Sequence, residues 1–365
     1  MRYLLQRVRT GEWLTRDFEL SEGQRTRALS AAGGINGVIT SEWRDGIAPD
    51  GKPYLWNWGT IVYAEEGGRI RNAGIVERVG FDKGKLTLEA PGFSRYAAGI
   101  PYTGVQQFIH VDPIVIGRHL WTHVQSTARG NIGLVVDPAA STPETLWIGD
   151  NAQPKALAWW ENTDCGGEFD ALAQQTPFDY AESHAYSNDA QTAVSHRLAI
   201  GFPRLGRKRT DLRFAEGENI TGYIPVDADG TEYANELIGI GSGEGSVMVH
   251  GTIAVDDGRL RRPKILTDKT ADKARIDSLI KAKLTIMLNE IDISQVTIQD
   301  HSNARLSALD PGDDILVQAT LDWLGPIRMW VRVLSITEVD EKPGVAVLAT
   351  RRSDSFLYSA TTEIS

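Results

Sequence analysis

The chain has 365 residues, 41% of them hydrophobic, with 10 Trp, 10 Tyr and 9 Phe and a formal net charge of -10. This composition supports packed cores in two to four domains and excludes general disorder, and no apolar run approaches the roughly 18–20 residues that span a bilayer. The acidic balance argues against a protein that reads nucleic-acid sequence, and the one cysteine excludes an internal disulfide framework. The N-terminus lacks the apolar segment and cleavage site of a secretory signal, so we expect the chain to fold in a cytosol.

The first 104 residues predict a β-rich domain of short strands bounded by turns. Residues 75–79 and 86–90 alternate apolar and polar side chains, as half-buried strands do. Glycine-containing turns at 67–68 and 82–84 suit antiparallel hairpins. We therefore predict a first small antiparallel β-barrel domain over residues 1–104, with strands at 3–8, 37–40, 60–65, 69–79 and 85–90.

Residues 105–194 predict a mixed α+β domain. Asp112 followed by Pro113 is typical of a helix start, with an N-cap and a proline in the first helical position. The apolar residues that follow recur at helical spacing until about Ser126, which predicts one helix. The rest of the domain is predicted to hold a second helix at 169–175 and strands at 131–136 and 178–187.

Residues 195–235 and 291–365 predict a second β-barrel domain, interrupted by an α/β insert at 236–290. The barrel strands are expected at 195–201, 212–215, 219–225, 315–323, 327–337 and 345–351, the last three after a turn at 310–314. The insert is expected to hold a strand at 247–255 and a helix at 268–288, whose apolar residues recur at helical spacing. The predicted class is thus β-rich α+β, with two barrels and two smaller α/β domains.

Four glycines at alternate positions, from Gly239 to Gly245, raise the question of a nucleotide-binding loop. A dinucleotide fingerprint needs glycine at its first, third and sixth positions, but the sixth position counted from Gly239 is Glu244. No Gly-Lys-Ser/Thr follows, and residues 247–253 are β-like, so no helix N-terminus is offered to an anion. We interpret the stretch as a flexible passage from the second barrel into its insert, where glycine allows positive φ and close backbone approach.

The candidate motifs for catalysis or metal binding also lack a residue or spacing that the chemistry requires. His119 and His123 are four residues apart on the predicted helix, but Leu120 stands where a zinc protease has its glutamate, so we interpret both as partly buried, hydrogen-bonded histidines. Ser242 is flanked by glycines at the wrong spacing for a nucleophile elbow. Cys165 lies in no nucleophile signature, and we interpret it as a structural thiol.

Charged and aromatic clusters also have structural explanations. The short basic runs at 204–209 and 259–264 lie beside turn residues, and paired aspartates occur in turns, where they bond to local backbone. Tryptophans at 43–58 and at 159–160 suit core or interface anchors better than sugar-stacking platforms. We therefore predict a protein that is not an enzyme, with no catalytic residues, no cofactor and no metal ligands.

Several segments, in order along nearly the whole chain, resemble the minor tail proteins of siphophages that infect actinobacteria. The first is the connector GFSRYAAGIPYTG at 92–104, and the second is the helical segment VDPIVIGRHLWTHVQ at 111–125. No segment is chemically diagnostic alone, so the resemblance depends on their succession. The other segments are 130–136, 214–220, 234–245 with 259–262, 310–315 with 330–333, and 351–358.

The resemblance implies a tail-tip, or baseplate, hub protein. Such hubs are homotrimers that close the tail tube, with two barrel domains related to tail-tube proteins and two smaller peripheral domains. The implied partners are further copies of the chain, the distal tail protein ring, the tape measure protein, and downstream minor tail or receptor-binding proteins. Phage DNA would pass through the channel without sticking, because three acidic chains repel phosphates. The implied location is the tail tip of the virion, assembled in the host cytoplasm, with no membrane insertion.

Two alternatives from other functional classes stay open. A tail-associated hydrolase of cell-wall glycan or peptide would need two carboxylates, or a metal site, converging in one cleft. The resemblance argues against it, because relatives with lytic activity carry further C-terminal domains, whereas the last predicted strand here ends shortly before Ser365. A carbohydrate-binding tail module would use exposed tryptophans.

Overall fold

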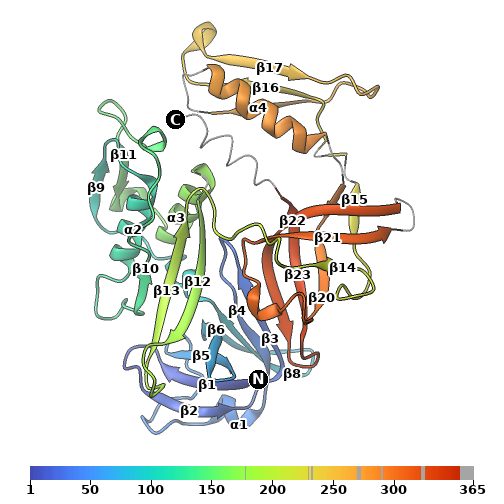
Figure 1. Ribbon diagram of the computed structural model, residues 1–365. Helices are drawn as coiled ribbons and strands as arrows, with labels where there is room; N and C mark the ends of the chain where they lie inside the picture. Colours follow the sequence, from blue (N-terminus) through green and yellow to red (C-terminus); the bar gives the residue numbers. More distant parts are fainter. Residues whose placement is uncertain are drawn as a thin grey trace.

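The computed structural model describes residues 1–176, 178–228, 230–231, 233–268, 273–288, 291–321 and 325–353. In these ranges the strands form several open sheets with few helices, and no sheet closes into a barrel (Figure 1). The β-rich prediction is therefore confirmed, whereas the two predicted antiparallel β-barrel domains are not confirmed. None of the helices in these ranges is long and apolar enough to cross a membrane.

The N-terminal segment contributes to two sheets. One has the strand order β2–β1–β5–β6, and the remaining strands join a larger, nine-stranded sheet. The predicted hairpin turns connect β5 to β6 and β7 to β8. Strands β2 and β3 were not predicted, because β2 has only Leu14 and Phe18 as buried positions and the buried positions of β3 are Gly23 and Arg25, so neither strand shows an apolar alternation. The elements are β1 (Arg2–Arg7), β2 (Trp13–Phe18), β3 (Ser21–Ala28), β4 (Gly34–Ile39), α1 (Ser41–Asp45), β5 (Thr60–Glu66), β6 (Arg69–Ile75), β7 (Arg78–Asp82) and β8 (Lys85–Pro91).

The middle segment packs two helices against two small sheets. The predicted first helix is confirmed, and the Asp112 side chain accepts a hydrogen bond from Ile114 N at 2.8 Å, as an N-cap should. The second helix begins at Cys165 rather than Phe169, because Asp164 provides another N-cap. The elements are η1 (Phe93–Ala97), β9 (Val105–Phe108), α2 (Pro113–Val124), β10 (Leu134–Val136), η2 (Glu144–Leu146), β11 (Lys155–Ala158), η3 (Trp159–Glu161), α3 (Cys165–Gln175), β12 (Asp179–Tyr186) and β13 (Val194–Gly201).

The C-terminal segment completes the nine-stranded sheet and adds the insert. The strand predicted at 219–225 is not formed, because the Asn219 side chain bonds to Ala215 N and Arg213 O and holds a turn there. Parts of the predicted elements at 268–288 and 315–323 lie outside the described residues. The elements are β14 (Phe214–Ala215), β15 (Val226–Ala228), β16 (Glu236–Ile240), η4 (Gly245–Val247), β17 (His250–Ala254), β18 (Pro263–Thr267), α4 (Lys273–Met287), β19 (Ile291–Ile293), β20 (Gln295–Gln299), η5 (Leu306–Ala308), β21 (Asp314–Leu321), β22 (Gly325–Val339) and β23 (Val345–Arg352).

Strand β22 joins the N-terminal and C-terminal halves. Its first half pairs with β21 and its second half with β3, while β23 pairs along its other edge. At the β3–β22 junction, Asp340 accepts hydrogen bonds from the Tyr3 hydroxyl at 2.7 Å and from the Arg25 guanidinium. The sequence predicted two separate barrels; the structure instead has one sheet that continues from one half into the other.

The apolar side chains gather in four cores. One lies under β1, β5 and β6 and continues into α2, α3, β12 and β13, so residues on both sides of the predicted boundary at 104 pack together. Two others lie on the nine-stranded sheet, one in each half of the molecule. The fourth belongs to the insert, where α4 covers one face of the sheet β17–β16–β18 at one end of the molecule (Figure 1). The domain limits themselves stay predictions.

The first half of the glycine stretch is a strand, so its interpretation as a flexible passage is corrected. Glu236–Ile240 is β16, the central strand of the insert, and it pairs with both β17 and β18. Gly239 faces α4, and a Cβ atom there would lie 2.5 Å from Cγ2 of Ile276. The glycine therefore allows the helix to pack closely on the strand, which is the close approach the sequence suggested.

Replacing Asp340 by Ala is expected to lower the free energy of unfolding by about 2–3 kcal/mol, because it leaves the buried Arg25 guanidinium without its carboxylate. Urea unfolding followed by circular dichroism measures this. Asp310→Ala is the control, since Asp310 is 73% exposed and its ion pair with Arg27 should contribute less than about 1 kcal/mol. Equal losses in the two variants would contradict a special role for the β3–β22 junction.

Replacing Gly239 by Ala is expected to destabilise the insert by about 1–3 kcal/mol, because the new methyl group overlaps Ile276 and Ile280 on α4. Hydrogen exchange of the β16, β17 and β18 amides should speed up while exchange in the nine-stranded sheet stays unchanged. Gly230→Ala is the matched control, since a Cβ atom there meets nothing within 4 Å. Unchanged exchange in the Gly239 variant would show that α4 is not tightly packed on the sheet.

Candidate functional site

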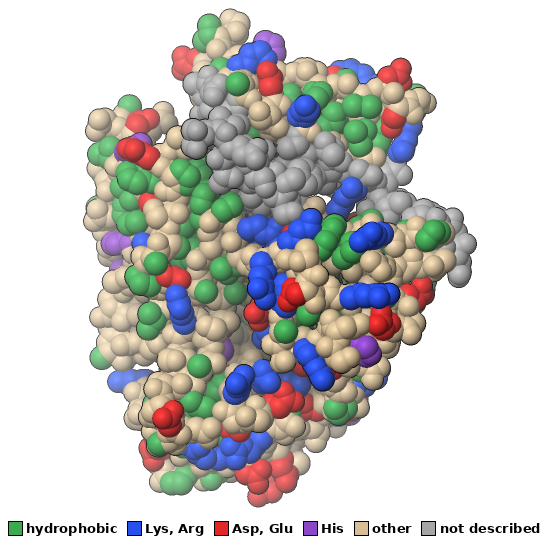
Figure 2. Space-filling model, viewed as in Figure 1, with side chains coloured by type: hydrophobic (Ala, Val, Ile, Leu, Met, Phe, Trp, Pro, Cys, Tyr) green, Lys and Arg blue, Asp and Glu red, His purple; other side chains and the backbone are tan. Residues whose placement is uncertain are grey.

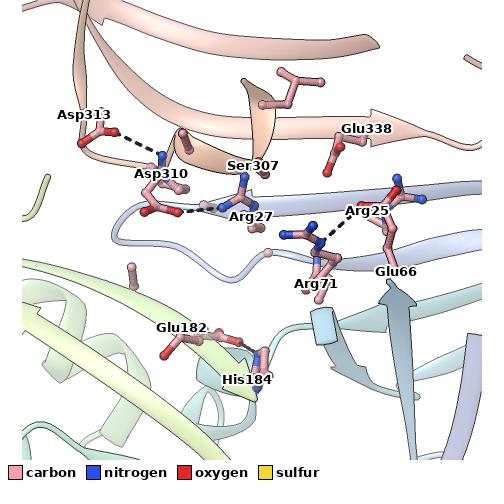
Figure 3. A pocket seen from close by; sticks show the side chains of 18 of the residues that line it. Arg25, Arg27, Glu66, Arg71, Glu182, His184, Ser307, Asp310, Asp313 and Glu338 are labelled. Carbon is pink, nitrogen blue, oxygen red and sulfur yellow. Dashed lines mark hydrogen bonds and ion pairs between the residues drawn. The ribbon is translucent and has the colours of Figure 1, made fainter. Parts of the chain in front are cut away.

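A polar cleft of about 1040 Å³ lies between the two halves of the nine-stranded sheet and the strand β12. Figure 3 shows side chains from β3, β6, β12, β22 and the segment before β21 on its walls. On the molecular surface, Lys and Arg side chains are spread down the middle of one face, interleaved with Asp and Glu (Figure 2). The charged lining consists of Arg25, Arg27, Arg71, Arg207, Arg209 and Arg305 with Glu66, Glu182, Asp300, Asp310, Asp313, Glu338 and Asp340.

The arginines of the cleft bind carboxylates of the same chain. Arg27 donates to Asp310 at 2.8 Å and Arg209 donates to Asp313 at 2.9 Å, and both contacts connect β-strands or loops that are far apart in sequence. Arg25 is likewise engaged by Asp340 at the β3–β22 junction. Because the positive charges are matched by neighbouring carboxylates, the cleft offers little net attraction to a phosphate.

A chain of buried polar groups leads from the cleft into the core of the middle segment. Glu182 accepts hydrogen bonds from Phe93 N and Ser94 N at 2.8 and 2.7 Å, and its carboxylate lies 3.5 Å from His184 Nε2. The Nδ1 atoms of His184 and His196 are 2.9 Å apart. His196 Nε2 lies 3.2 Å from the Tyr63 hydroxyl oxygen, which completes the chain.

The hydrogen bonds determine where the protons lie. Tyr63 donates to Gln6 Oε1 at 2.7 Å, so its oxygen accepts from His196 Nε2, and His196 Nδ1 is left as an acceptor. His184 Nδ1 must then donate to it, and Nε2 of the same ring faces the Glu182 carboxylate. With His184 donating through Nδ1, all the contacts of a neutral His196 ring are satisfied.

The pKa shifts agree with this assignment. Burial, together with the nearby charge of His184, lowers the pKa of His196 to about 3. Burial alone would raise the pKa of Glu182, but hydrogen bonds from His184 and Ser94 and the charge of His184 outweigh it, so this pKa is lowered. Sequence reasoning missed the histidine pair because its members are 12 residues apart; only the β12–β13 register places His184 opposite His196.

The residues weighed from the sequence lie elsewhere. His119 Nε2 lies 2.8 Å from the Tyr102 hydroxyl, and His123 Nε2 accepts from Thr103 N at 3.1 Å, so both histidines are hydrogen-bonded as interpreted. Cys165 is buried at the start of α3, where burial and then Asp164 raise its pKa to about 11. In the described ranges, no cluster of three or more His, Cys, Asp or Glu side chains is arranged to hold a metal ion. That there are no site residues stays a prediction.

The nine-stranded sheet carries two cores on one face and polar side chains on the other. Between β4 and β8, Ile35 and Ala90 are paired within a core, whereas the next pair, Asn36 and Glu89, is exposed on the opposite face. Across the β3–β22 junction this face continues through hydroxyls that lie 3.1 Å apart. We call this surface the polar face; it comprises Gln24, Thr26, Asn36, Thr87, Glu89, Thr297, Gln299 and Thr337.

Replacing His196 by Gln is expected to flatten the pH dependence of stability between pH 7 and 5. A depressed pKa in the folded state means that the unfolded chain binds more protons in this range, so the wild type loses stability as the pH falls below 6.5. The loss at pH 5 is about 2 kcal/mol, and Gln has no proton to take up. Urea unfolding at each pH measures it, with His110→Gln as an exposed control. Parallel profiles for wild type and the His196 variant would contradict the assignment.

The fold is shared with proteins from phage tails. The 43 kDa tail protein of prophage MuSo2 from Shewanella oneidensis has a TM-score of 0.59 and 11% identity over 98% of this chain and 100% of that one. A tail protein from Neisseria meningitidis MC58 has a TM-score of 0.59 and 13% identity over 99% of both chains. Prophage tail protein gp18 from Listeria monocytogenes EGD-e has a TM-score of 0.56 and 12% identity over 100% of this chain and 98% of that one.

A scan against protein-family models and a search of curated proteins give no match. The similar structures span this chain and their own chains almost completely, so the shared fold includes the insert and the middle segment as well as the nine-stranded sheet. They come from Shewanella, Neisseria and Listeria, and therefore do not single out phages of actinobacteria. The chain has the fold of phage tail proteins from end to end.

Proposed function

We propose that the chain is a structural protein of a phage tail tip, a homotrimeric hub that adapts the tail tube to the parts that contact the host. The observation that carries this proposal is the whole-length match to three tail proteins, in which nearly every residue of both chains is covered. The proposal includes the partners implied by the sequence resemblance: the distal tail protein ring above, the tape measure protein within, and minor tail or receptor-binding proteins below.

The nine-stranded sheet supports this role. The polar face extends across both halves of the chain, where its amides and hydroxyls alternate with the partly buried Val38, Val339, Val345 and Val347, and it suits the wall of a water-filled channel. Its side chains are mostly amides and hydroxyls, which would let phage DNA pass without strong attachment. On the other face, the ion pair between the buried Arg25 and Asp340 joins the two halves and favours one placement of each relative to the other, as a load-transmitting ring component requires.

The free edge of β7 is a candidate contact between copies. Within the described parts of the chain this strand pairs with β8 alone, and Phe81 on it is 71% exposed. An exposed strand edge with an aromatic side chain is an aggregation hazard unless another chain covers it. In the proposed trimer, a neighbouring copy covers this edge.

No observation favours the hydrolase. Carboxylates that converge in the cleft are held by arginines, and Glu182 is held ionised by its buried partners, whereas a glycosidase needs a carboxylic acid that keeps its proton. Zymography on purified cell wall tests this directly, and clearing by the isolated chain would contradict the structural role.

Mass photometry of the purified chain is expected to show a particle with three times the 40.1 kDa of one chain, and cryo-electron microscopy with the distal tail protein should show it as a threefold cap on a sixfold ring. Phe81→Ser should shift the particle towards monomer without changing the melting temperature. Leu260→Ser is the control, since Leu260 in the insert is also an exposed apolar residue, and it should leave the trimer intact. A stable monomer that does not bind the distal tail protein ring would contradict the hub proposal.

A further inference from the structure

Two neighbouring tryptophans lie on the surface of the middle segment with no role in any core. Trp159 and Trp160 form the short helix η3 directly after β11, and their side chains are 62% and 60% exposed. The ring centroids are 5.5 Å apart and the ring planes meet at 85°. Each indole therefore keeps an open ring face, and together the two faces form a corner. Exposed aromatic surface of this kind marks a binding site more often than a fold requirement.

The backbone holds this corner in place. Trp159 N donates to Gly104 O at 2.9 Å, and β11 is paired residue by residue with β9 up to Ala158 and Val105. After the second tryptophan the chain turns at Asn162, which has a left-handed φ of 50° and donates its N–H back to Trp159 O. The rings are thus presented by paired strands and a closed turn, which reduces the entropy lost when a ligand binds.

The strands that present the two rings expose both polar and apolar side chains. Glu161 follows Trp160 directly and is exposed, and on the paired strand β9 Gln106 and Val105 are exposed opposite Leu157 and Ala158. The Thr103 hydroxyl is engaged by His123 Nε2 at 3.2 Å. Lys155 is the one cation within residues 103–108 and 155–162, and it is engaged by Glu168 at 2.5 Å. An anionic ligand would therefore find no partner charge, and the acidic side chain would repel it.

These features select one class of ligand. A pyranose ring has an apolar face of C–H groups that stacks on an indole face, and a rim of hydroxyls that both donate and accept hydrogen bonds. We propose that Trp159 and Trp160 form a binding site for a neutral saccharide, with one sugar stacked on a tryptophan and its hydroxyls bound by Glu161 or Gln106. An apolar protein surface suits the corner less well, because the two ring planes do not form one flat patch. The site is shallow, so the affinity of one sugar unit is about millimolar.

The experiment uses the full chain and neutral tetrasaccharides of glucose, galactose, mannose and N-acetylglucosamine as probes. Binding is followed by isothermal titration calorimetry and by saturation-transfer NMR, which identifies the sugar protons in contact with the protein. At least one tetrasaccharide is expected to bind, with ring C–H protons showing the strongest transfer. If none of the four binds at millimolar concentration, the proposal is overturned.

Matched variants locate the site. Trp159→Ala and Trp160→Ala should each weaken binding roughly tenfold or more, whereas Trp159→Phe should keep part of it because a smaller ring face remains. Trp56→Ala is the control, since this tryptophan is also exposed but lies beside Arg7 and Lys52 in the N-terminal segment. Binding that survives both alanine variants, or alanine variants that instead change the oligomeric mass, would overturn the proposal. Because sugar binding is measured on the purified chain alone, absence of binding would not contradict the hub proposal, and absence of a trimer would not contradict the sugar site.

Discussion

The pairing of β22 with β3 is the contact on which the rest of the structure depends. It joins the last third of the chain to its first 30 residues, so a single sheet continues through both halves and places their cores on the same face. The register shift between Val333 and Ser335 lets one strand pair with β21 before it and with β3 after it. Side-chain hydrogen bonds from Tyr3 and Arg25 to Asp340 add to the backbone pairing of β22 with β3.

Charged side chains of the cleft form ion pairs with other side chains of the same chain. Although the net charge is -10, the cleft between the halves contains nearly balanced arginines and carboxylates, and the pairs connect residues that are about 100 to 300 positions apart. Ion pairs of this kind are sensitive to geometry, because an unpaired buried charge is costly, and they therefore favour one relative placement of the two halves.

Much of the fold could be predicted from the sequence. What could not be predicted depends on contacts between residues far apart in the chain. Local signals worked: the Asp112 N-cap, the glycine turns of the hairpins and the apolar spacing of α4 all formed the expected elements. Pairing between distant strands leaves no local signal, so the continuous sheet was predicted as two barrels. The same limit applied to the site, since neither His184 nor His196 stands out until β12 and β13 are in register. The sequence drew attention to Trp159 and Trp160, but whether these side chains are buried or exposed depends on tertiary packing, which leaves no local signal.

The two short strands at the base of the insert have a consequence of their own. β15 and β19 pair in register from Val226 with Ile293 to Ala228 with Ile291, so the chain leaves the C-terminal half and returns to it at the same point. With respect to the nine-stranded sheet, the whole insert is one long hairpin loop. The insert has its own apolar core, so its packing depends little on the rest of the chain. Lengthening, shortening or exchanging such a loop adds little closure entropy. Chains with this fold can therefore vary the insert in size and surface while the nine-stranded sheet stays the same.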